Sequence, residues 1–345
     1  MSQREEYIDI AKAIGIILVV IGHTKFNYSQ FIYQFHLPLF FFLSGLVFNE
    51  KKLNDPGRFI LSKIKGLYLP FIKFELLFLI FHNIFVRLNF ISELSGTVLH
   101  YEFPYIVKMA LKMITMGAGE QLAGPLWFLI SSLEIVIIFA ILIKITSLFG
   151  EYRNLLLTII CIILYYVGCY VDIPRMMSQS FIGMLFFNFG YLYKSYKSKI
   201  TINKRGFFIS VITIFVCSLL NQVDISQLKI TYKVLLIISG VAGSYAVIYL
   251  AKQIVKRKMW LSFLSYCGKN TIYVLALHCL SFKLIMVLEM VIYRFDQKYL
   301  GYFPTYEINN WWFIILSIAG VCIPLLLKKI IDGLKEKVKG KIRIW

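Results

Sequence analysis

The stretch that decides the fold is the first long apolar run, YIDIAKAIGIILVVIGHT, residues 7–24. Its length is close to the roughly 20 residues that a helix needs to cross a lipid bilayer. Asp9, Lys12 and His23 interrupt the run, and each of them raises the cost of moving such a helix out of water. A simple membrane anchor has no use for a carboxylate, an ammonium and an imidazole, so these residues point to a role inside the membrane.

The composition of the whole chain agrees with a membrane location. Of its 345 residues, 59% are hydrophobic, and the mean hydropathy is +0.73, whereas ordinary soluble domains are about half apolar. The net charge of +19 does not indicate nucleic-acid binding, because the lysines and arginines lie in short clusters between apolar segments, as topology signals do. The chain is therefore predicted to be an integral membrane protein.

The apolar runs predict an all-α, polytopic membrane helix bundle of about ten transmembrane helices. The predicted spans cover residues 8–24, 30–49, 67–86, 122–143, 154–171, 179–193, 206–222, 232–251, 270–292 and 309–327. Basic clusters such as KSYKSKITINKR (194–205) and KQIVKRK (252–258) fall on one side if both termini are cytoplasmic. Residues 1–330 then form the transmembrane domain, and residues 331–345 form a basic cytoplasmic tail.

Two other segments have simple interpretations. The long connection at residues 87–121 contains YEFPYIVKMALKMITMG (101–117), which is predicted to lie as an amphipathic stretch on the bilayer surface. Six cysteines are scattered through or beside the apolar runs without metal-ligand spacing and are interpreted as packing residues. We therefore predict no metal site, no disulfide framework and no permanently bound cofactor.

Helical geometry places the polar residues of the first span on one side. At about 100° per residue, Asp9 and His23 lie within roughly 40° of each other, and Lys12 lies about 60° from Asp9. At 1.5 Å per residue, His23 is roughly 21 Å along the helix from Asp9. Such a stripe is expected to face the bundle interior or a wet cavity, with His23 in the outer half of the membrane.

The second span offers a histidine at a similar depth. In QFHLPLFFFLSG (34–45), His36 enters shortly after the outer turn, and Pro38 removes a backbone donor and disturbs the preceding turn. Imidazole titrates near neutrality, so this pair suits general base catalysis. Ser44 is a weak nucleophile candidate, since it has one glycine after it but lacks the full flanking pattern of a nucleophile elbow. For other interior polar residues, among them Lys73 and Lys283, a satisfied helix–helix contact is an equal alternative. For His82, near the end of its span, that contact is the favoured interpretation.

Four motifs resemble one family. IDIAKAIGIILVVIGHT (8–24) followed by QFHLPLFFFLSGLVF (34–48) is similar to the start of the acyltransferase-3 family of integral membrane acyltransferases, especially its fucose 4-O-acetylase-like branch. GPLWFLISSLE (124–134) and LSYCGKNTIYVLALHCL (264–280) resemble two later segments of that family. The resemblance covers essentially the whole chain.

This resemblance implies transfer of an acyl group, usually acetyl from cytoplasmic acetyl-CoA, to a carbohydrate hydroxyl. His23 is the expected catalytic residue and His36 its partner, with Asp9 and Lys12 as a supporting stripe. Basic residues of RFILSKIKGLYLP (58–70) are expected to meet the CoA phosphates, although Gly66 interrupts the common paired-arginine form. These donor-binding residues are Arg58, Lys63 and Lys65. The residues expected to bind substrate or line a tunnel are Ser44, Trp127, Glu134, Asn270, Tyr273 and His278.

Several alternatives stay open from the sequence. A transporter or flippase for a lipid-linked glycan would also carry polar residues inside a polytopic bundle. A sensor or scaffold, whose histidines only satisfy each other, is a third interpretation. The abundance of Lys, Ile, Phe, Tyr and Asn is typical of an AT-rich bacterial genome, which suggests the bacterial cell membrane. Capsule, exopolysaccharide, teichoic acid or O-antigen sugars, reached through membrane lipid, are then the expected acceptors.

Overall fold

The fold is almost entirely helical. The computed structural model describes residues 5–91, 100–117, 119–306 and 311–342, and 81% of it is helix. Within those ranges the only sheet is a two-stranded antiparallel hairpin of β1 (Val223–Asp224) and β2 (Lys229–Ile230). The prediction of an all-α protein is confirmed.

Each predicted span coincides with helical structure in the described residues. The helices at these positions are α1 (Glu6–His23), α2 (Ser29–Tyr33), α3 (His36–Leu46), α5 (Leu69–Arg87), α7 (Trp127–Thr146), α8 (Arg153–Tyr170), α9 (Met177–Tyr196), α10 (Lys204–Leu220), α11 (Lys233–Arg257), α13 (Thr271–Tyr293) and α14 (Trp312–Ile342). Shorter elements connect them: η1 (Glu50–Asn54), α4 (Pro56–Lys63), η2 (Ile64–Tyr68), α6 (Phe103–Ile114), η4 (Gln121–Leu126), η5 (Ser147–Tyr152), α12 (Leu261–Lys269) and η6 (Gln297–Gly301).

Five helical stretches of the described residues are long and apolar enough to cross a membrane, which indicates a membrane-embedded protein. They are Pro56–Arg87, Gln121–Tyr170, Lys233–Arg257, Thr271–Tyr293 and Trp312–Lys337. The decisive helix α1 is not among them, since it carries Glu6, Asp9 and Lys12 within 18 residues. The number of ten crossings and the cytoplasmic position of the termini therefore stay predictions.

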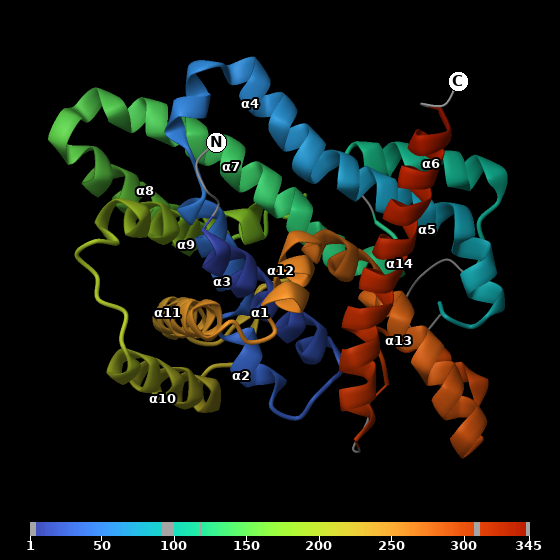
Figure 1. Ribbon diagram of the computed structural model, residues 1–345. Helices are drawn as coiled ribbons and strands as arrows, with labels where there is room; N and C mark the ends of the chain where they lie inside the picture. The colour runs from blue at the N-terminus through green and yellow to red at the C-terminus, as the bar shows by residue number, and fades with distance from the viewer. Residues whose placement is uncertain (1–4, 92–99, 118, 307–310, 343–345) are drawn as a thin grey trace.

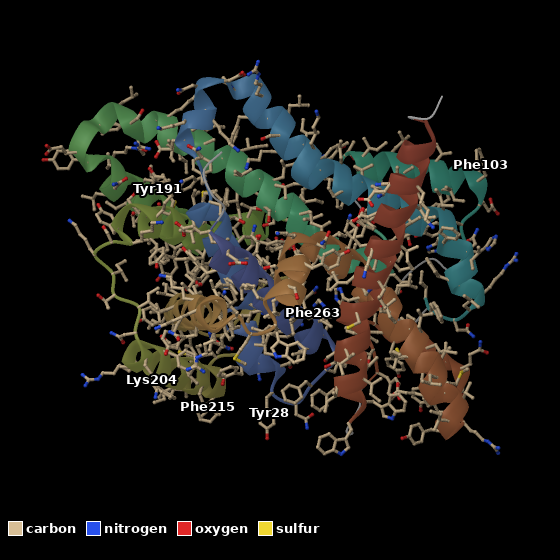
Figure 2. All side chains as sticks on the ribbon, viewed as in Figure 1. Tyr28, Phe103, Tyr191, Lys204, Phe215 and Phe263 are labelled. Atoms are coloured by element: carbon tan, nitrogen blue, oxygen red, sulfur yellow. The ribbon has the colours of Figure 1, made fainter. Side chains whose placement is uncertain are left out.

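Helix α1 lies at the centre of the bundle (Figure 1), where it contacts α3, α11, α12, α13 and α14. Many large apolar side chains are exposed on the outer surface, as expected for helices facing lipid: Phe103 on α6 and Phe215 on α10 both project from it (Figure 2). The predicted amphipathic stretch forms α6, on which Val107 and Leu111 extend the exposed row that Phe103 begins. Its place at the bilayer surface stays a prediction.

The disturbance predicted for the turn before Pro38 is a break between two helices, so the predicted span 30–49 is divided. Helix α2 ends at Tyr33 and α3 begins at His36, so Pro38 falls in the first turn of α3, where a missing N–H is tolerated. The carbonyl of Gln34, four residues before the proline, accepts a hydrogen bond from the Ser239 hydroxyl on α11 at 3.3 Å. A side chain from a distant helix thus replaces the backbone donor that proline lacks.

Two glycines bring α3 and α9 into backbone contact. A Cβ atom on Gly45 would lie 1.9 Å from the Phe187 carbonyl oxygen, and one on Gly190 would lie 1.9 Å from the Phe42 carbonyl oxygen. Both distances are far below van der Waals contact, so only glycine allows the two helices to pack this closely. Small residues serve the same purpose in many membrane helix pairs.

Alanine substitutions should have opposite effects on stability at a glycine inside the contact between α3 and α9 and at a glycine with open space around it. Gly190→Ala should lower stability by about 1–3 kcal/mol, because the new methyl group has to push the backbones apart. Gly333→Ala on α14 is the matched control: nothing lies within 4 Å of its added Cβ, and removing a helix glycine there should stabilise by about 0.5–1 kcal/mol. Thermal unfolding in detergent measures both, and an unchanged midpoint for Gly190→Ala would contradict the packing.

Candidate functional site

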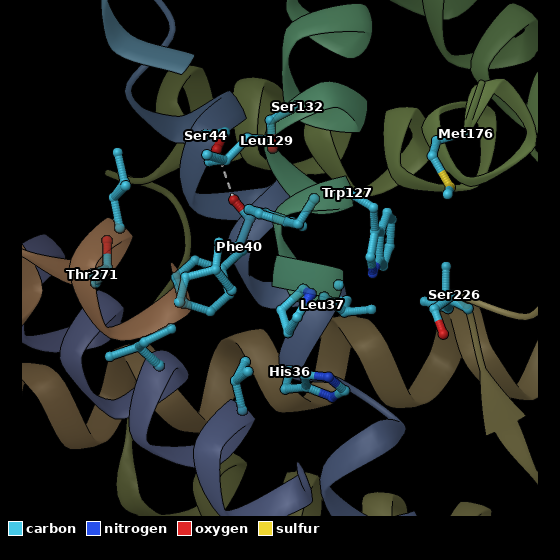
Figure 3. A pocket seen from close by; sticks show the side chains of 18 of the residues that line it. His36, Leu37, Phe40, Ser44, Trp127, Leu129, Ser132, Met176, Ser226 and Thr271 are labelled. Atoms are coloured by element: carbon cyan, nitrogen blue, oxygen red, sulfur yellow. Dashed lines mark hydrogen bonds between the residues drawn. The ribbon is translucent and has the colours of Figure 1, made fainter. Parts of the chain in front are cut away.

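A cavity of about 760 Å³ lies between the helices of the bundle. Figure 3 shows part of its wall: His36, Leu37, Phe40 and Ser44 follow one another along α3, and Trp127 faces them from the start of α7. Helix α1 adds a third side with Lys12, Ile16, Val19 and His23. Most of the lining is apolar, so its few polar groups stand out as candidates for binding or chemistry.

The cavity is lined by connecting segments at both ends of the helices. One end is lined by Ser62, Lys63 and Gly66, which precede α5, and the other by Met176 and the segment 223–227 at the hairpin. In the predicted topology these groups lie on opposite sides of the membrane. Lys12 and His23 are eleven residues apart on α1, so the cavity extends at least about 16 Å along that helix.

His23 lines this cavity and forms a hydrogen bond with a second histidine. Its Nδ1 is 2.7 Å from Nε2 of His278 on α13, and the two rings stack with centroids 5.0 Å apart. His278 is fully buried, and its own Nδ1 lies 2.9 Å from the Val274 carbonyl oxygen. The predicted tunnel-lining residue His278 is thus the hydrogen-bond partner of the predicted catalytic residue.

The same pair could be read as part of a metal centre. Donor atoms of His23, His278 and Cys279 all lie within 4.8 Å of one another. Two nitrogen ligands on one tetrahedral zinc ion would be about 3.4 Å apart, whereas the observed 2.7 Å is a hydrogen-bond distance. The geometry therefore fits a hydrogen bond between the rings better than two ligands on a shared ion.

His36 also lines the cavity but does not hydrogen-bond to His23. Its Nδ1 donates to the Ile32 carbonyl oxygen at 3.0 Å, which leaves Nε2 as the unprotonated nitrogen of the neutral ring. The Tyr33 ring lies 5.3 Å from the His36 ring. His36 is thus placed to accept a hydrogen bond from a ligand, and its role as a partner of His23 stays a prediction.

The polar stripe of α1 is divided between the cavity and the protein interior. Lys12 and Ile16 line the cavity together with His23, as the helical spacing predicts. Asp9 is buried at 3% exposure, at a point where α12 approaches α1 closely: a Cβ on Gly268 would lie 1.9 Å from the Asp9 carbonyl oxygen. This contact fixes α12, and hence the start of α13, against α1.

The three predicted donor-binding residues occupy different places. Lys63 lines the main cavity, and Lys65 lines an adjoining cavity of about 280 Å³. The side chain of Arg58 is 90% exposed, is paired with Asp55 at 3.1 Å and lines neither cavity. Ile272 lines both cavities, so the two spaces are neighbours.

The smaller cavity is strongly basic. Lys73 and Lys269 join Lys65 in its wall, next to the predicted residues Asn270 and Tyr273. The Tyr273 ring has the Lys73 ammonium 5.8 Å and the Lys328 ammonium 5.1 Å from its centroid. Lys73 and Lys269 were not predicted as a group, because only the fold brings them together from α5 and α12.

The remaining predicted residues divide between the cavity wall and packing. Ser44 and Trp127 line the main cavity, and the Ser44 hydroxyl donates to the Phe40 carbonyl oxygen at 2.8 Å (Figure 3). Glu134 lines neither cavity and instead accepts a hydrogen bond from Ser180 at 2.5 Å. The tunnel-lining prediction for Glu134 is thus without support from the cavity geometry.

A polar group at the hairpin end was missed from the sequence. Asp224, Ser226 and Gln227 line the main cavity, and Ser226 lies opposite Trp127 and Met176 in Figure 3. The signal available was the alternation of apolar and polar residues at positions 223–226, which is typical of a strand. Gln179 on α9 holds this segment in place by donating to the Ser226 carbonyl oxygen at 3.1 Å.

Fold and site together define a helical membrane protein with a histidine-containing internal cavity. A family model described as an acyltransferase domain matches residues 5–329, which is nearly the whole chain. The chain belongs to the acyltransferase-3 family and is a membrane acyltransferase. No curated protein and no solved structure matches it.

The two ends of the cavity should be accessible to a thiol reagent from opposite sides of the membrane. If both termini are cytoplasmic, Ser62→Cys should react with a membrane-impermeant maleimide only from the cytoplasmic side, and Ser226→Cys only from the opposite side. Labelling of intact cells and of inverted vesicles measures this, with the unsubstituted chain reporting the background from its six cysteines. Labelling of both variants from the same side would contradict the predicted topology.

Proposed function

We propose that this protein is a membrane-bound O-acyltransferase that moves acetyl from acetyl-CoA to a hydroxyl of a cell-surface or lipid-linked carbohydrate, with His23 as general base. One observation carries the proposal: the cavity that contains the His23 imidazole reaches from the basic segment before α5 to the hairpin before α11. A cytoplasmic donor and an acceptor from the other side can therefore meet at one imidazole.

The basic end of the cavity suits the donor. Acetyl-CoA carries several phosphate charges, and lysines bind phosphate as point charges. Within the described residues, no carboxylate pairs with Lys65, Lys73 or Lys269, so these ammonium groups are available to an anionic ligand. The narrow pantetheine arm would pass Ile272, which the two cavities share, and carry the thioester towards His23.

The hairpin end suits a carbohydrate. Trp127 offers a flat apolar face on which a sugar ring can stack, and Asp224, Ser226 and Gln227 offer hydrogen-bonding groups beside it. Capsule, exopolysaccharide, teichoic acid or O-antigen sugars of a bacterial cell all present such rings. A lipid-linked acceptor would reach this end through the membrane.

The transfer needs one proton acceptor and returns that proton. As the acceptor oxygen bonds to the acetyl carbon, its proton moves to His23; as the carbon–sulfur bond breaks, the CoA thiolate takes that proton. A two-step route through acetyl-histidine balances equally well. In both routes the alcohol is acetylated and free CoA is released.

The alternative of a transporter or flippase is not favoured, because the chain belongs to an acyltransferase family. The test is to incubate membranes containing the protein with labelled acetyl-CoA and glycan, and to compare surface glycans by mass spectrometry with and without the gene. Acetyl label in the glycan, and one acetyl mass per modified repeat, support the proposal. Transport without incorporation of label would overturn it.

Loss of the imidazole should abolish transfer. His23→Ala is expected to lower kcat by about 10²- to 10⁴-fold, the usual contribution of a general base, while the protein still folds in membranes. Initial rates with labelled acetyl-CoA and the thermal unfolding midpoint measure the two effects. Full activity of His23→Ala would remove this residue from the mechanism.

The lysine-rich cavity predicts a donor-specific effect on KM. Lys65→Gln and Lys73→Gln should each raise KM for acetyl-CoA roughly tenfold, as expected when a charge-assisted hydrogen bond of about 1.5 kcal/mol is lost. KM for S-acetylpantetheine, which lacks the nucleotide phosphates, should not change. Arg58→Gln is the matched control, since that side chain lines neither cavity. An equal rise for both thioesters would show that the lysines do not contact phosphate.

A further inference from the structure

The hydrogen bonds from His23 to His278 and from His278 to the Val274 carbonyl oxygen can be assigned donors and acceptors. A carbonyl oxygen can only accept, so the 2.9 Å contact with Val274 requires a proton on Nδ1 of His278. A neutral imidazole carries one such proton, and therefore Nε2 of His278 is an acceptor. The proton in the 2.7 Å contact consequently belongs to Nδ1 of His23.

This assignment leaves one nitrogen of His23 for a ligand. With its proton on Nδ1, a neutral His23 has its lone pair on Nε2. Burial favours the neutral form of His278, because the ring is fully buried and no described carboxylate forms a hydrogen bond or ion pair with it. The Cys279 sulfur, 3.5 Å from Nε2 of His278, is at most a second weak donor to the same lone pair.

His36 differs from His23 because no second histidine ring among the described residues forms a hydrogen bond with it. Its Nδ1 is also held by a backbone carbonyl of its own helix, that of Ile32. In His36 that bond determines the tautomer directly, whereas in His23 the tautomer is determined by a ring from α13. A proton taken up by His23 can therefore be shared with His278, and His36 has no comparable partner among the described residues.

We propose that His278 is the positioning residue of His23: it selects the tautomer that leaves Nε2 of His23 unprotonated, and it shares the Nδ1 proton when the imidazolium forms. This inference rests on the proposed function and adds to it the atom that takes the acceptor's proton. The acceptor O–H proton moves to Nε2 of His23, and the departing CoA thiolate later removes it. The histidine pair ends with the protons it began with.

Substitutions of His278 separate this role from packing. Met has a similar size, but its thioether sulfur is only a weak acceptor for the hydrogen bond from His23, whereas the side-chain oxygen of Gln is a good one. His278→Met should lower kcat by about 10²- to 10⁴-fold, the scale of loss when a catalytic histidine has the wrong tautomer. KM for acetyl-CoA and for the acceptor should stay within twofold. His278→Gln should recover kcat to within about tenfold of the unsubstituted protein.

Two neighbours on α13 provide matched controls. Ser281→Ala changes another buried polar side chain, whose hydroxyl only donates to the Leu277 carbonyl oxygen, and should leave kcat unchanged. Cys279→Ala, assayed with and without a strong chelator, tests the metal interpretation and should also keep full activity. If His278→Met does not fold, His278→Asn replaces it, because its amide is too short to reach His23.

The outcomes distinguish this inference from the proposed function. Unchanged kcat in His278→Met, or a Gln variant no more active than a folded Met variant, would overturn the positioning role. Loss of activity in Cys279→Ala or with chelator would assign the pair to a metal site and overturn it as well. If the unsubstituted protein transfers no acetyl at all, the proposed function itself fails, whatever the variants do.

Discussion

Polar groups that a membrane bundle holds out of water need partners inside the protein, and the contact between His23 and His278 meets this constraint at the cavity. It joins two residues 255 positions apart in the chain. In the proposed mechanism it also determines which nitrogen of His23 is left without a proton, so one hydrogen bond would give the ring its partner and leave the other nitrogen as the base.

Close helix packing makes that hydrogen bond possible. Gly268 lets α12 approach the backbone of α1 at Asp9, and α12 leads directly into α13, which carries His278. On the other wall, the backbone contact between α3 and α9 at Gly45 and Gly190 holds α3, with His36, in its place. Rings on different helices are thus kept in register by positions at which any side chain would be too large.

The two ends of the cavity differ in their chemistry. The end before α5 carries Lys63, and three more lysines line the adjoining cavity, where an anionic donor would be held by charge. The hairpin end combines an indole ring with a carboxylate, a hydroxyl and an amide, groups that recognise a ring bearing hydroxyls. Between these ends most of the wall is apolar, which suits the pantetheine arm and thioester of the proposed donor.

The sequence by itself determined where the helices form and which face of α1 carries the polar residues of the cavity. Apolar runs predict where helices form, and helical spacing predicts that Lys12 and His23 share a face, because both are local properties of the chain. Pro38 likewise marks the break before α3. The family resemblance also follows from local motifs, and the match over residues 5–329 confirms the acyltransferase-3 family. The fucose 4-O-acetylase-like branch stays a prediction.

Only the tertiary structure decided which residues meet. Spacing along one helix says nothing about a partner on another, so the pairing of His23 with His278 could not be derived from the sequence. The same holds for Lys65, Lys73 and Lys269 around one cavity, for the exposure of Arg58 away from it, and for the hairpin at its far end. Local sequence specifies the face of a helix, whereas the packing of all helices together specifies what that face touches.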